Sequence, residues 1–363
     1  MGFKCGIVGL PNVGKSTLFN ALTNKIVAAE NYPFCTIDPN IGTVPIPDAR
    51  LDKISQIVEP KKTIPAVMQF VDIAGLVKGA SKGEGLGNKF LANIRETDAI
   101  AQVVRCFDDK NVLHVSDDLS PRADIELINT ELALADLDTI DRVLAKASKQ
   151  AKTNNKKDVQ YKNLLENASR LLNDGKFLRD GNYSQNERKQ LGQLNLLTMK
   201  KILFIANVSE AGFSNNPYLN EVIDYCSQGK EVVIPVCAKI ESELSELNSD
   251  EKLEFLADME LIEPGLDRVI KAGYDLLGLQ TYFTAGKKEV KAWTIRKGCT
   301  APEAASVIHS DFERGFICAE VMSYKDFVAY GGESQAKEAG KLRLEGKEYI
   351  VSDGDIVHFR FNV

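Results

Sequence analysis

Short apolar runs alternate with amphipathic stretches along the chain. Runs of the kind found in buried strands cover residues 3–8, 66–72, 99–106, 200–206 and 232–236. After the first run, the apolar residues between positions 16 and 22 recur at helical spacing. Buried strands that alternate with helices are typical of α/β proteins. The pattern therefore predicts an α/β core built around these strands.

A long amphipathic segment separates the third of these strands from the fourth. Ser120 and Pro121 suit the start of its first helix, as a cap residue and a proline at the first helical position. Apolar residues recur at three-to-four spacing as far as Leu144, and a second series runs from Tyr161 to Leu172. We expect an antiparallel helical hairpin that projects from the core.

Lysines gather around the expected tip of this hairpin. They are Lys146, Lys149, Lys152, Lys156, Lys157 and Lys162, with Asp158 the only acid among them. One interpretation is a solvated tip that keeps the hairpin soluble, because charge runs usually have that role. The other is a finger that binds the phosphate backbone of a nucleic acid. The sequence leaves both interpretations open.

The last part of the chain predicts a small α/β unit that begins near Gly278. Strand-like runs cover 279–284, 290–295, 349–351 and 357–361, and helical runs cover 302–312 and 333–339. This arrangement is typical of a β-grasp domain. Trp293 lies in an alternating strand, so we expect it to pack in the core rather than to stack on bases.

Residues Gly9 to Ser16 read GLPNVGKS and fit the phosphate-binding pattern G-x-x-x-x-G-K-[ST] between a predicted strand and a predicted helix. Glycines let such a loop close around phosphates, and a helix N-terminus favours an anion. Lys15 would reach the β- and γ-phosphates as the catalytic charge, and Ser16 would ligate Mg²⁺. The residues expected to hold the nucleotide here are Asn12, Val13, Gly14, Lys15, Ser16 and Thr17.

Two later segments are placed to respond to the γ-phosphate. A proline-punctuated loop at residues 31–40 can offer a threonine to Mg²⁺, and both Thr36 and Thr43 are candidates. Asp72 ends a buried strand, where an aspartate can hold Mg²⁺ through water, and the N–H of Gly75 can contact the γ-phosphate. The glycine-rich stretch that follows predicts a mobile second switch.

Two further strand ends predict the base-binding part of the site. They deliver NVSE at residues 207–210 and CAK at residues 237–239, where guanine-binding proteins carry N-K-x-D and S-A-K. An aspartate selects guanine because it accepts from N1–H and the 2-amino group, which adenine lacks. Glu210 and Val208 depart from that pattern, whereas Asn207 suits adenine. ATP is therefore expected to bind more tightly than GTP, in contact with Asn207, Val208, Glu210 and Ala238.

Composition narrows the class of protein further. The 363 residues carry a net charge of −6, so there is no overall attraction to nucleic acid. Seven cysteines with no C-x-x-C pair predict reduced thiols rather than a disulfide or zinc framework. We see neither a signal-peptide pattern nor an apolar run long enough to cross a bilayer. We therefore expect a cytoplasmic protein without a membrane partner.

The motifs, together with their departures from the guanine pattern, resemble those of the YchF/Obg-like ATPases, a branch of the Obg-related P-loop proteins. The likeness includes residues 31–36 and 72–80 and extends over the whole chain. It implies slow hydrolysis of ATP in preference to GTP, association with ribosomes, a helical domain and a C-terminal TGS domain. It also implies that Thr36, rather than Thr43, is the switch threonine.

The residue after Gly75 predicts slow intrinsic turnover. Many GTPases have a glutamine there that orients the attacking water, but this chain has Leu76. Asn12 resembles the asparagine with which potassium-using relatives hold K⁺ beside the phosphates. His114 is the second candidate helper, because its loop leaves the carboxyl end of a core strand. A surface histidine without a catalytic role is the alternative interpretation.

We therefore expect a P-loop domain at residues 1–120 and 200–277, a helical hairpin insertion at 121–199 and a TGS-like β-grasp domain at 278–363. The leading function is an Mg²⁺-dependent ATPase switch that binds the ribosome or its RNA through the hairpin tip and the TGS-like domain. The alternatives are a guanine-specific GTPase and a nucleic-acid-binding protein that uses nucleotide only as a gate.

Overall fold

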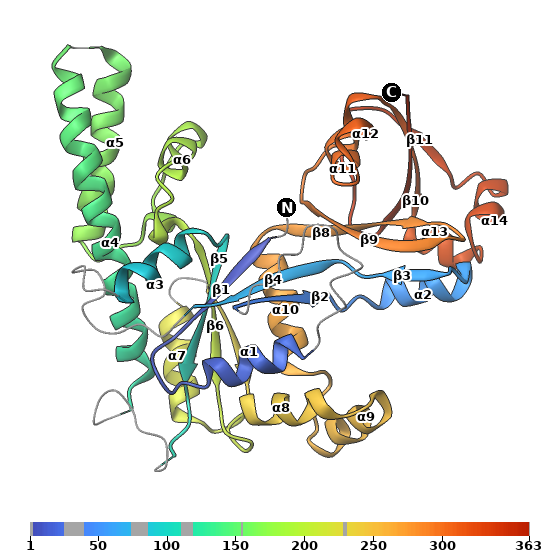
Figure 1. Cartoon of the computed structure of the whole chain (residues 1–363), viewed down its shortest axis with the longest axis horizontal. Coiled ribbons are helices and arrows are strands. Elements are labelled where there is room, and N and C mark those ends of the chain that lie inside the picture. Colours follow the sequence, from blue (N-terminus) through green and yellow to red (C-terminus); the bar gives the residue numbers. More distant parts are fainter. Residues whose placement is uncertain are drawn as a thin grey trace.

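The computed structural model describes residues 3–24, 40–73, 86–109, 119–153, 155–227 and 231–362. Within these ranges the chain forms two six-stranded sheets, and a long helical hairpin projects from the first (Figure 1). Helices pack against both sheets. The prediction of an α/β P-loop core with a helical insertion and a C-terminal β-grasp-like sheet is confirmed.

The first sheet has the strand order β2-β4-β1-β5-β6-β7. Its strands are β1 (Lys4–Val8), β2 (Ile41–Pro45), β4 (Val67–Asp72), β5 (Ala99–Arg105), β6 (Lys201–Asn207) and β7 (Val232–Val236). Only β2 runs antiparallel to its neighbour; the other pairs are parallel. All residues of the central strand β5 are buried, which agrees with a sequence that is apolar except for Gln102 and the terminal Arg105.

Helices cover this first sheet and form its hydrophobic core. They are α1 (Lys15–Thr23), α3 (Leu86–Arg95), α7 (Pro217–Ser227), α8 (Ala238–Glu246), α9 (Ser249–Asp258) and α10 (Gly265–Leu276), whereas α2 (Ala49–Val58) packs against the second sheet. Helix α1 packs beside α8 and β2, while α10 packs on β6 and β7. The parallel strands all end at the same edge of the sheet, which is where open α/β sheets bind their ligands.

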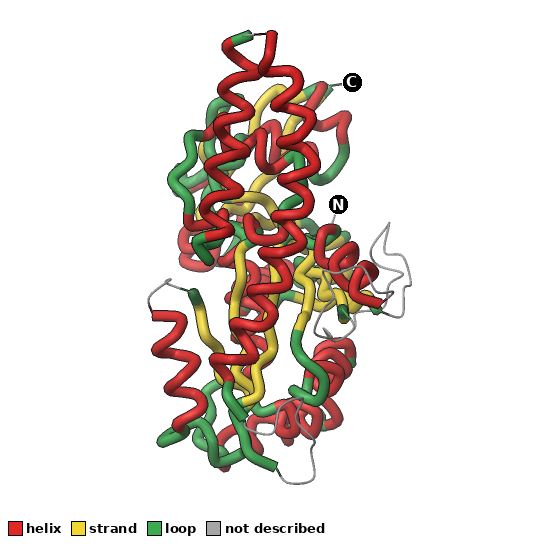
Figure 2. The backbone as a smooth tube through the Cα atoms, turned by 90° about the vertical axis from the view of Figure 1, so that its left-hand side faces the viewer, coloured by secondary structure: helices red, strands yellow, loops and turns green. Residues whose placement is uncertain are grey.

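The helical hairpin consists of α4 (Pro121–Gln150) and α5 (Lys156–Asn173), which lie side by side along their length (Figure 2). The short turn η3 (Ala151–Thr153) follows α4, and η4 (Leu178–Asp180), α6 (Gln185–Gly192) and η5 (Leu197–Met199) lead back to the core. Ser120 caps α4 by accepting from the Ala123 N–H at 3.3 Å, and Pro121 follows it, as predicted. The hairpin has its own apolar core, which includes Ile140 and Leu165.

A buried carboxylate fixes the base of the hairpin. Asp136 of α4 is fully buried and accepts from the N–H groups of Leu197 and Thr198 at 2.9 and 2.7 Å and from the Thr198 hydroxyl at 2.7 Å. Burial raises the pKa of Asp136, and these hydrogen bonds oppose that effect. On the same helix, Thr139 accepts from Arg95 at the end of α3 at 3.1 Å. The hairpin is therefore attached to the first sheet by specific polar contacts as well as by packing.

The second sheet has the order β11-β10-β12-β8-β9-β3. Its strands are β3 (Lys62–Ile64), β8 (Leu279–Ala285), β9 (Glu289–Arg296), β10 (Phe316–Ser323), β11 (Arg343–Glu345) and β12 (Asp355–Phe361); its helices are α11 (Ala301–Ser306), α12 (Ser310–Arg314), α13 (Tyr324–Ala329) and α14 (Glu333–Glu338). Trp293 is half-buried, packs against this sheet's core, and donates to the Thr284 hydroxyl at 3.0 Å.

Three details of this second unit differ from the sequence prediction. The helix expected at 302–312 is two short helices, α11 and α12. The strand expected at 349–351 is only an isolated antiparallel bridge between Thr300 and Ile350, in which Val351 N–H donates to the Cys299 carbonyl at 3.0 Å and Ala301 N–H to the Tyr349 carbonyl at 2.8 Å. Strands β10 and β11 were not predicted at all.

The second sheet is not built from C-terminal residues alone. Strand β3, from the first fifth of the chain, pairs in parallel with β9. Arg50 of α2 adds a second contact between this part of the chain and the C-terminal residues. Its Nη1 donates to the Asp353 carboxylate at 2.7 Å, and its Nε donates to Asp48 at 2.9 Å. The Lys287 ammonium also donates to the Val58 carbonyl at 2.9 Å. The segment from α2 to β3 thus connects the two sheets.

The described residues contain no helix that is both long and apolar enough to cross a membrane. The six cysteines within them are free thiols, of which Cys5, Cys106, Cys226 and Cys237 are buried.

Candidate nucleotide-binding site

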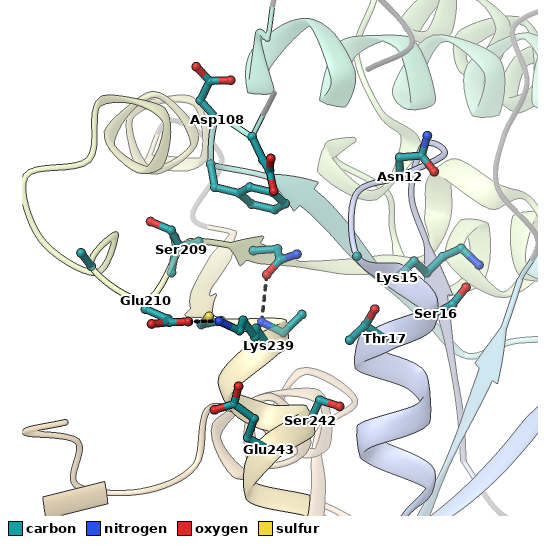
Figure 3. A pocket seen from close by; sticks show the side chains of 18 of the residues that line it. Asn12, Lys15, Ser16, Thr17, Asp108, Ser209, Glu210, Lys239, Ser242 and Glu243 are labelled. Carbon is teal, nitrogen blue, oxygen red and sulfur yellow. Dashed lines mark hydrogen bonds and ion pairs between the residues drawn. The ribbon is translucent and has the colours of Figure 1, made fainter. Parts of the chain in front are cut away.

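A pocket of about 1320 Å³ opens at the carboxyl edge of the first sheet. Four segments line it: the P-loop and the start of α1, the residues after β5, the residues after β6, and the start of α8 (Figure 3). Of the predicted nucleotide contacts, the pocket brings together Asn12, Gly14, Lys15, Ser16, Thr17, Asn207, Val208, Glu210 and Ala238. Thr36, Gly75 and His114 lie outside the described residues. Val13 is buried behind the loop.

The P-loop turns tightly at two positions with left-handed backbone. Asn12 has φ 61° and Gly14 has φ 90°, conformations that asparagine tolerates and glycine adopts freely. A Cβ on Gly14 would lie 2.1 Å from the Asn207 amide nitrogen, so a larger residue does not fit. No side chain caps α1 at Gly14, which leaves the first N–H groups of the helix for an anion.

Lys15, which lines the pocket, forms an ion pair with Asp72, which lies behind it and does not line the pocket. Strand β4 lies beside β1, with Ile7 opposite Asp72, so the end of β4 meets the start of α1. Lys15 is only 8% exposed, and the Asp72 side chain is 20% exposed. The ammonium of Lys15 and the carboxylate of Asp72 therefore neutralise each other.

Asn207 connects the P-loop to the start of α8. Its amide nitrogen donates to the Val13 carbonyl at 2.9 Å, and its amide oxygen accepts from the Ala238 N–H at 3.0 Å. An asparagine amide has two N–H hydrogens and two oxygen lone pairs. One hydrogen and one lone pair of Asn207 therefore remain for a base. The structure thus gives Asn207 a role in positioning the loop that the sequence did not reveal, beside the base contact that we predicted.

The other two base-site residues have different surroundings. Val208 is 2% exposed, and its N–H donates to the Val236 carbonyl at 2.9 Å. Glu210 is exposed and forms an ion pair with Lys239 of α8 at 2.6 Å (Figure 3). This pairing raises the pKa of Lys239. The carboxylate at the guanine-reading position is therefore bound to an ammonium group.

The sequence interpretation missed several residues that line the pocket: Phe107, Asp108, Asp109, Ser242 and Glu243. Figure 3 shows Asp108 on the side opposite Ser242 and Glu243, with Lys15 and Ser16 between these two sides. Phe107, Asp108 and Asp109 come just after the end of β5. The rule that ligands bind beyond the carboxyl ends of strands therefore points to them. Ser242 and Glu243 lie inside α8 and carry no such signal.

The donor set fits a magnesium ion that is shared with phosphates. The described residues contain no group of three or more His, Cys, Asp or Glu side chains that could form a metal site by themselves. Ser16 is exposed to the pocket, and Asp72 lies beside Lys15 at the phosphate end. Mg²⁺ in nucleotide sites takes one or two protein oxygens and completes its shell with phosphate oxygens and water, which agrees with a hydroxyl and a carboxylate here.

A phosphate-binding loop between β1 and α1, an aspartate at the end of β4 and an asparagine at the end of β6 define a P-loop nucleoside triphosphatase with a G-domain-like sheet. Residues 4–159 match the family model described as "50S ribosome-binding GTPase", and residues 279–362 match the YchF-GTPase C-terminal model, described as a protein of unknown function.

Full-length comparisons identify the family. The chain is 59% identical to the "Ribosome-binding ATPase YchF" of Pasteurella multocida and 54% identical to the protein of that name from Bacillus subtilis, in each case over 100% of both chains. The solved structure of the Schizosaccharomyces pombe YchF GTPase superposes with a TM-score of 0.90 at 38% identity, over 99% of this chain and 98% of that one. This protein belongs to the YchF family.

Proposed function

We propose that this protein is an Mg²⁺-dependent nucleoside triphosphatase that prefers ATP to GTP and acts as a nucleotide switch on the ribosome. The observation that carries the proposal is a pocket lined by Lys15 and Ser16, in which Lys15 is paired with Asp72 and the base site is altered at two guanine-reading positions. The names of the YchF relatives, which describe ribosome-binding ATPases, support the same function.

The phosphate end of the pocket would work as follows. The first N–H groups of α1 and the Lys15 ammonium bind the β- and γ-phosphates once Lys15 leaves Asp72. Ser16 would hold Mg²⁺ directly and Asp72 would hold it through water, with Thr36 as the switch threonine and Gly75 contacting the γ-phosphate. Bound Mg²⁺ neutralises charge that develops on the phosphate oxygens during transfer.

Hydrolysis needs a helper because Leu76 has no hydrogen-bonding side chain. One helper is K⁺, which Asn12 would hold beside the phosphates; Asn12 lines the pocket at the P-loop. The other is His114, five residues beyond Asp109 in the sequence; Phe107 to Asp109 line the pocket. Comparison of turnover in K⁺ and Na⁺, for the unmodified protein and for His114→Ala, separates the two helpers.

The Glu210–Lys239 pair supports the proposed preference for ATP. Guanine recognition needs a carboxylate that accepts from two guanine donors, and here Lys239 competes for one oxygen of the Glu210 carboxylate. The lysine position of the N-K-x-D pattern, two residues before Glu210, is Val208, and the buried side chain of a valine offers neither a charge nor a hydrogen bond. The remaining hydrogen and lone pair of Asn207 suit the 6-amino group and N7 of adenine.

The partner surface would be the lysine-rich tip of the hairpin together with the C-terminal unit, which we interpret as TGS-like. Lys146, Lys149, Lys152, Lys156 and Lys157 are exposed, and no ion-pair partner for them is found in the described part of the chain. Lys162 is half-buried and pairs with Glu166 at 3.1 Å. A ribosome-bound role implies a cytoplasmic location.

We retain the expected division into a P-loop domain at 1–120 and 200–277, a hairpin at 121–199 and a TGS-like unit from 278. We change this division at one point. Residues 62–64 are assigned to the TGS-like unit, because β3 pairs with β9 in the second sheet.

Single-turnover hydrolysis of ATP and GTP, with and without ribosomes, tests the proposal. We expect slow ATP hydrolysis that requires Mg²⁺ and increases when ribosomes are added. Binding of nucleotide without turnover in any condition would favour the nucleotide-gated binding protein. Faster turnover and tighter binding of GTP would favour the guanine-specific alternative.

A further inference from the structure

One wall of the nucleotide pocket is shaped by an arginine that does not itself line the pocket. Arg105 is the last residue of β5 and is only 2% exposed. Its Nε donates to the Phe107 carbonyl at 3.1 Å, and its Nη2 donates to the Asp109 carbonyl at 3.1 Å. The guanidinium also lies 4.8 Å from the centre of the Phe107 ring. A single planar group thus holds two carbonyls and one ring of the same short segment.

This arrangement uses properties that arginine alone provides. The guanidinium presents N–H donors in a fixed fork, so it can bind two acceptors at once, and its flat face attracts an aromatic ring. A lysine ammonium is a single point charge on a flexible stem. Since burial of a charge is costly, a residue that only filled space at this position would be apolar. The side chain therefore sets the backbone of residues 107–109.

A second contact fixes the residue between Arg105 and this segment. The Asn216 amide donates to the Cys106 carbonyl at 2.8 Å, and its oxygen accepts from the first N–H groups of α7, at 3.0 Å from Tyr218 and 3.2 Å from Leu219. The Cys106 N–H in turn donates to the Asn207 carbonyl at 2.8 Å. The wall is therefore tied to α7 and to the end of β6, where the base site begins.

The residues held in this way face the nucleotide pocket. Phe107, Asp108 and Asp109 all line it, opposite the start of α8 (Figure 3). The carbonyls of Phe107 and Asp109 accept from Arg105. The side chain of Asp108, which lies between them, is exposed at the pocket. We propose that Arg105 is a positioning residue for nucleotide binding, which holds Phe107 to Asp109 in the shape of this wall. The proposal rests on the nucleotide-binding function inferred above.

Hydrogen exchange in the nucleotide-free protein tests the positioning directly. In Arg105→Ala we expect the amides of residues 106–109 to exchange at least tenfold faster, because two inward carbonyls lose their donor. Arg105→Lys, which can reach only one carbonyl, should give an intermediate rate. Arg179→Ala is the matched control: Arg179 pairs with Glu231 at 2.9 Å and lies 4.3 Å from the Phe177 ring, but it does not line the pocket. It should leave these amides unchanged.

Equilibrium binding then tests the consequence for nucleotide. We expect Arg105→Ala to weaken ATP and GTP by the same factor, at least tenfold, because the wall is not the base-reading part; Arg179→Ala should bind both as the unmodified protein does. Affinity within twofold of the unmodified protein in a folded Arg105→Ala overturns the proposal, and so do unchanged amide rates. If Arg105→Ala does not fold, unchanged affinity and exchange in Arg105→Lys overturn it. If the unmodified protein binds neither nucleotide, the proposed function fails first and the positioning role fails with it.

Discussion

Lys15 and Asp72 form an ion pair that joins the P-loop helix to the end of β4. Both residues have a second partner in the proposed mechanism, since the lysine must bind phosphate and the aspartate must lie near Mg²⁺. Binding of Mg²⁺ with a nucleotide therefore exchanges one internal ion pair for two new interactions. The affinity for the nucleotide should therefore depend on Mg²⁺, and the affinity for Mg²⁺ on the nucleotide.

The first prediction concerns Asp72→Asn, which keeps the shape of the side chain and removes its charge. We expect the increase in ATP affinity that Mg²⁺ produces to fall at least tenfold, about 1.4 kcal/mol. ADP affinity in a chelator should be retained or improved, because Lys15 is released. Titration calorimetry with and without Mg²⁺ measures both. Lys15→Ala is the control and should weaken binding in both conditions; an unchanged Mg²⁺ effect in Asp72→Asn would contradict the metal role.

The second prediction concerns the base. Restoring the guanine pattern with Val208→Lys and Glu210→Asp should shift the ratio of ATP to GTP affinity toward GTP by at least tenfold, since a good bidentate base contact is worth about 1–3 kcal/mol. Glu210→Gln is the matched control: it releases Lys239 but its amide nitrogen cannot accept from guanine, so GTP should gain nothing. Because Val208 is buried, Glu210→Asp alone should also be measured. Tighter binding of GTP than of ATP by the unmodified protein would contradict the argument.

The third prediction concerns the hairpin tip. Changing Lys149, Lys152, Lys156 and Lys157 to alanine should weaken ribosome binding. It should also flatten the slope of log affinity against log salt, by about 0.7–0.9 for each lysine that neutralises a phosphate. Nucleotide affinity should not change. The matched control replaces four exposed lysines away from the tip: Lys53, Lys61, Lys176 and Lys189. An equal loss in both variants would show that net charge, rather than the tip, is responsible.

The fourth prediction concerns alkaline pH. Burial raises the pKa of the Cys5, Cys106 and Cys226 thiols from 9.0 to about 12. The folded protein thus keeps these protons at a pH where the unfolded chain releases them. Their contribution to stability is complete below pH 9 and is lost as the pH rises toward 12. Each thiol should lower the free energy of unfolding by about 1.4 kcal/mol per pH unit within that window.

Urea unfolding at several pH values between 8 and 11 measures this effect. Lysines and tyrosines titrate in the same range, so the informative quantity is the difference between the unmodified protein and Cys106→Ala. That difference should shrink as the pH rises above 9. A difference that is constant with pH would mean that the thiol is ionised in the folded protein as readily as in the unfolded chain.

The core of the fold was predictable because buried parallel strands are continuous apolar runs. All five strands expected in the first sheet are present. Strand β2 was missed because it is short and ends in Pro45, and β3 because it has only three residues, two of them exposed. Strand β10 contains Glu320, which is buried and pairs with Arg360 of β12. A pairing between distant strands cannot be inferred from the pattern of either one.

For the site, the motifs located the residues but not their partners. The P-loop, Asp72 and the NVSE tetrad could be assigned from local pattern and order along the chain. The contacts of Lys15 with Asp72, of Asn207 with Val13, and of Glu210 with Lys239 each join segments that are far apart in sequence. Their geometry depends on how helices pack on the finished sheet, which local pattern does not contain.

Strand β3 makes the order of synthesis relevant to this protein. The last residue that lines the nucleotide pocket is Glu243, whereas the partner of β3 begins at Glu289. During translation the pocket residues are all made before β3 has a strand to pair with. A chain that terminates between these two points therefore carries the complete lining of the pocket together with an unpaired edge. Such a fragment would leave the segment from α2 to β3 without the sheet that it joins in the full chain.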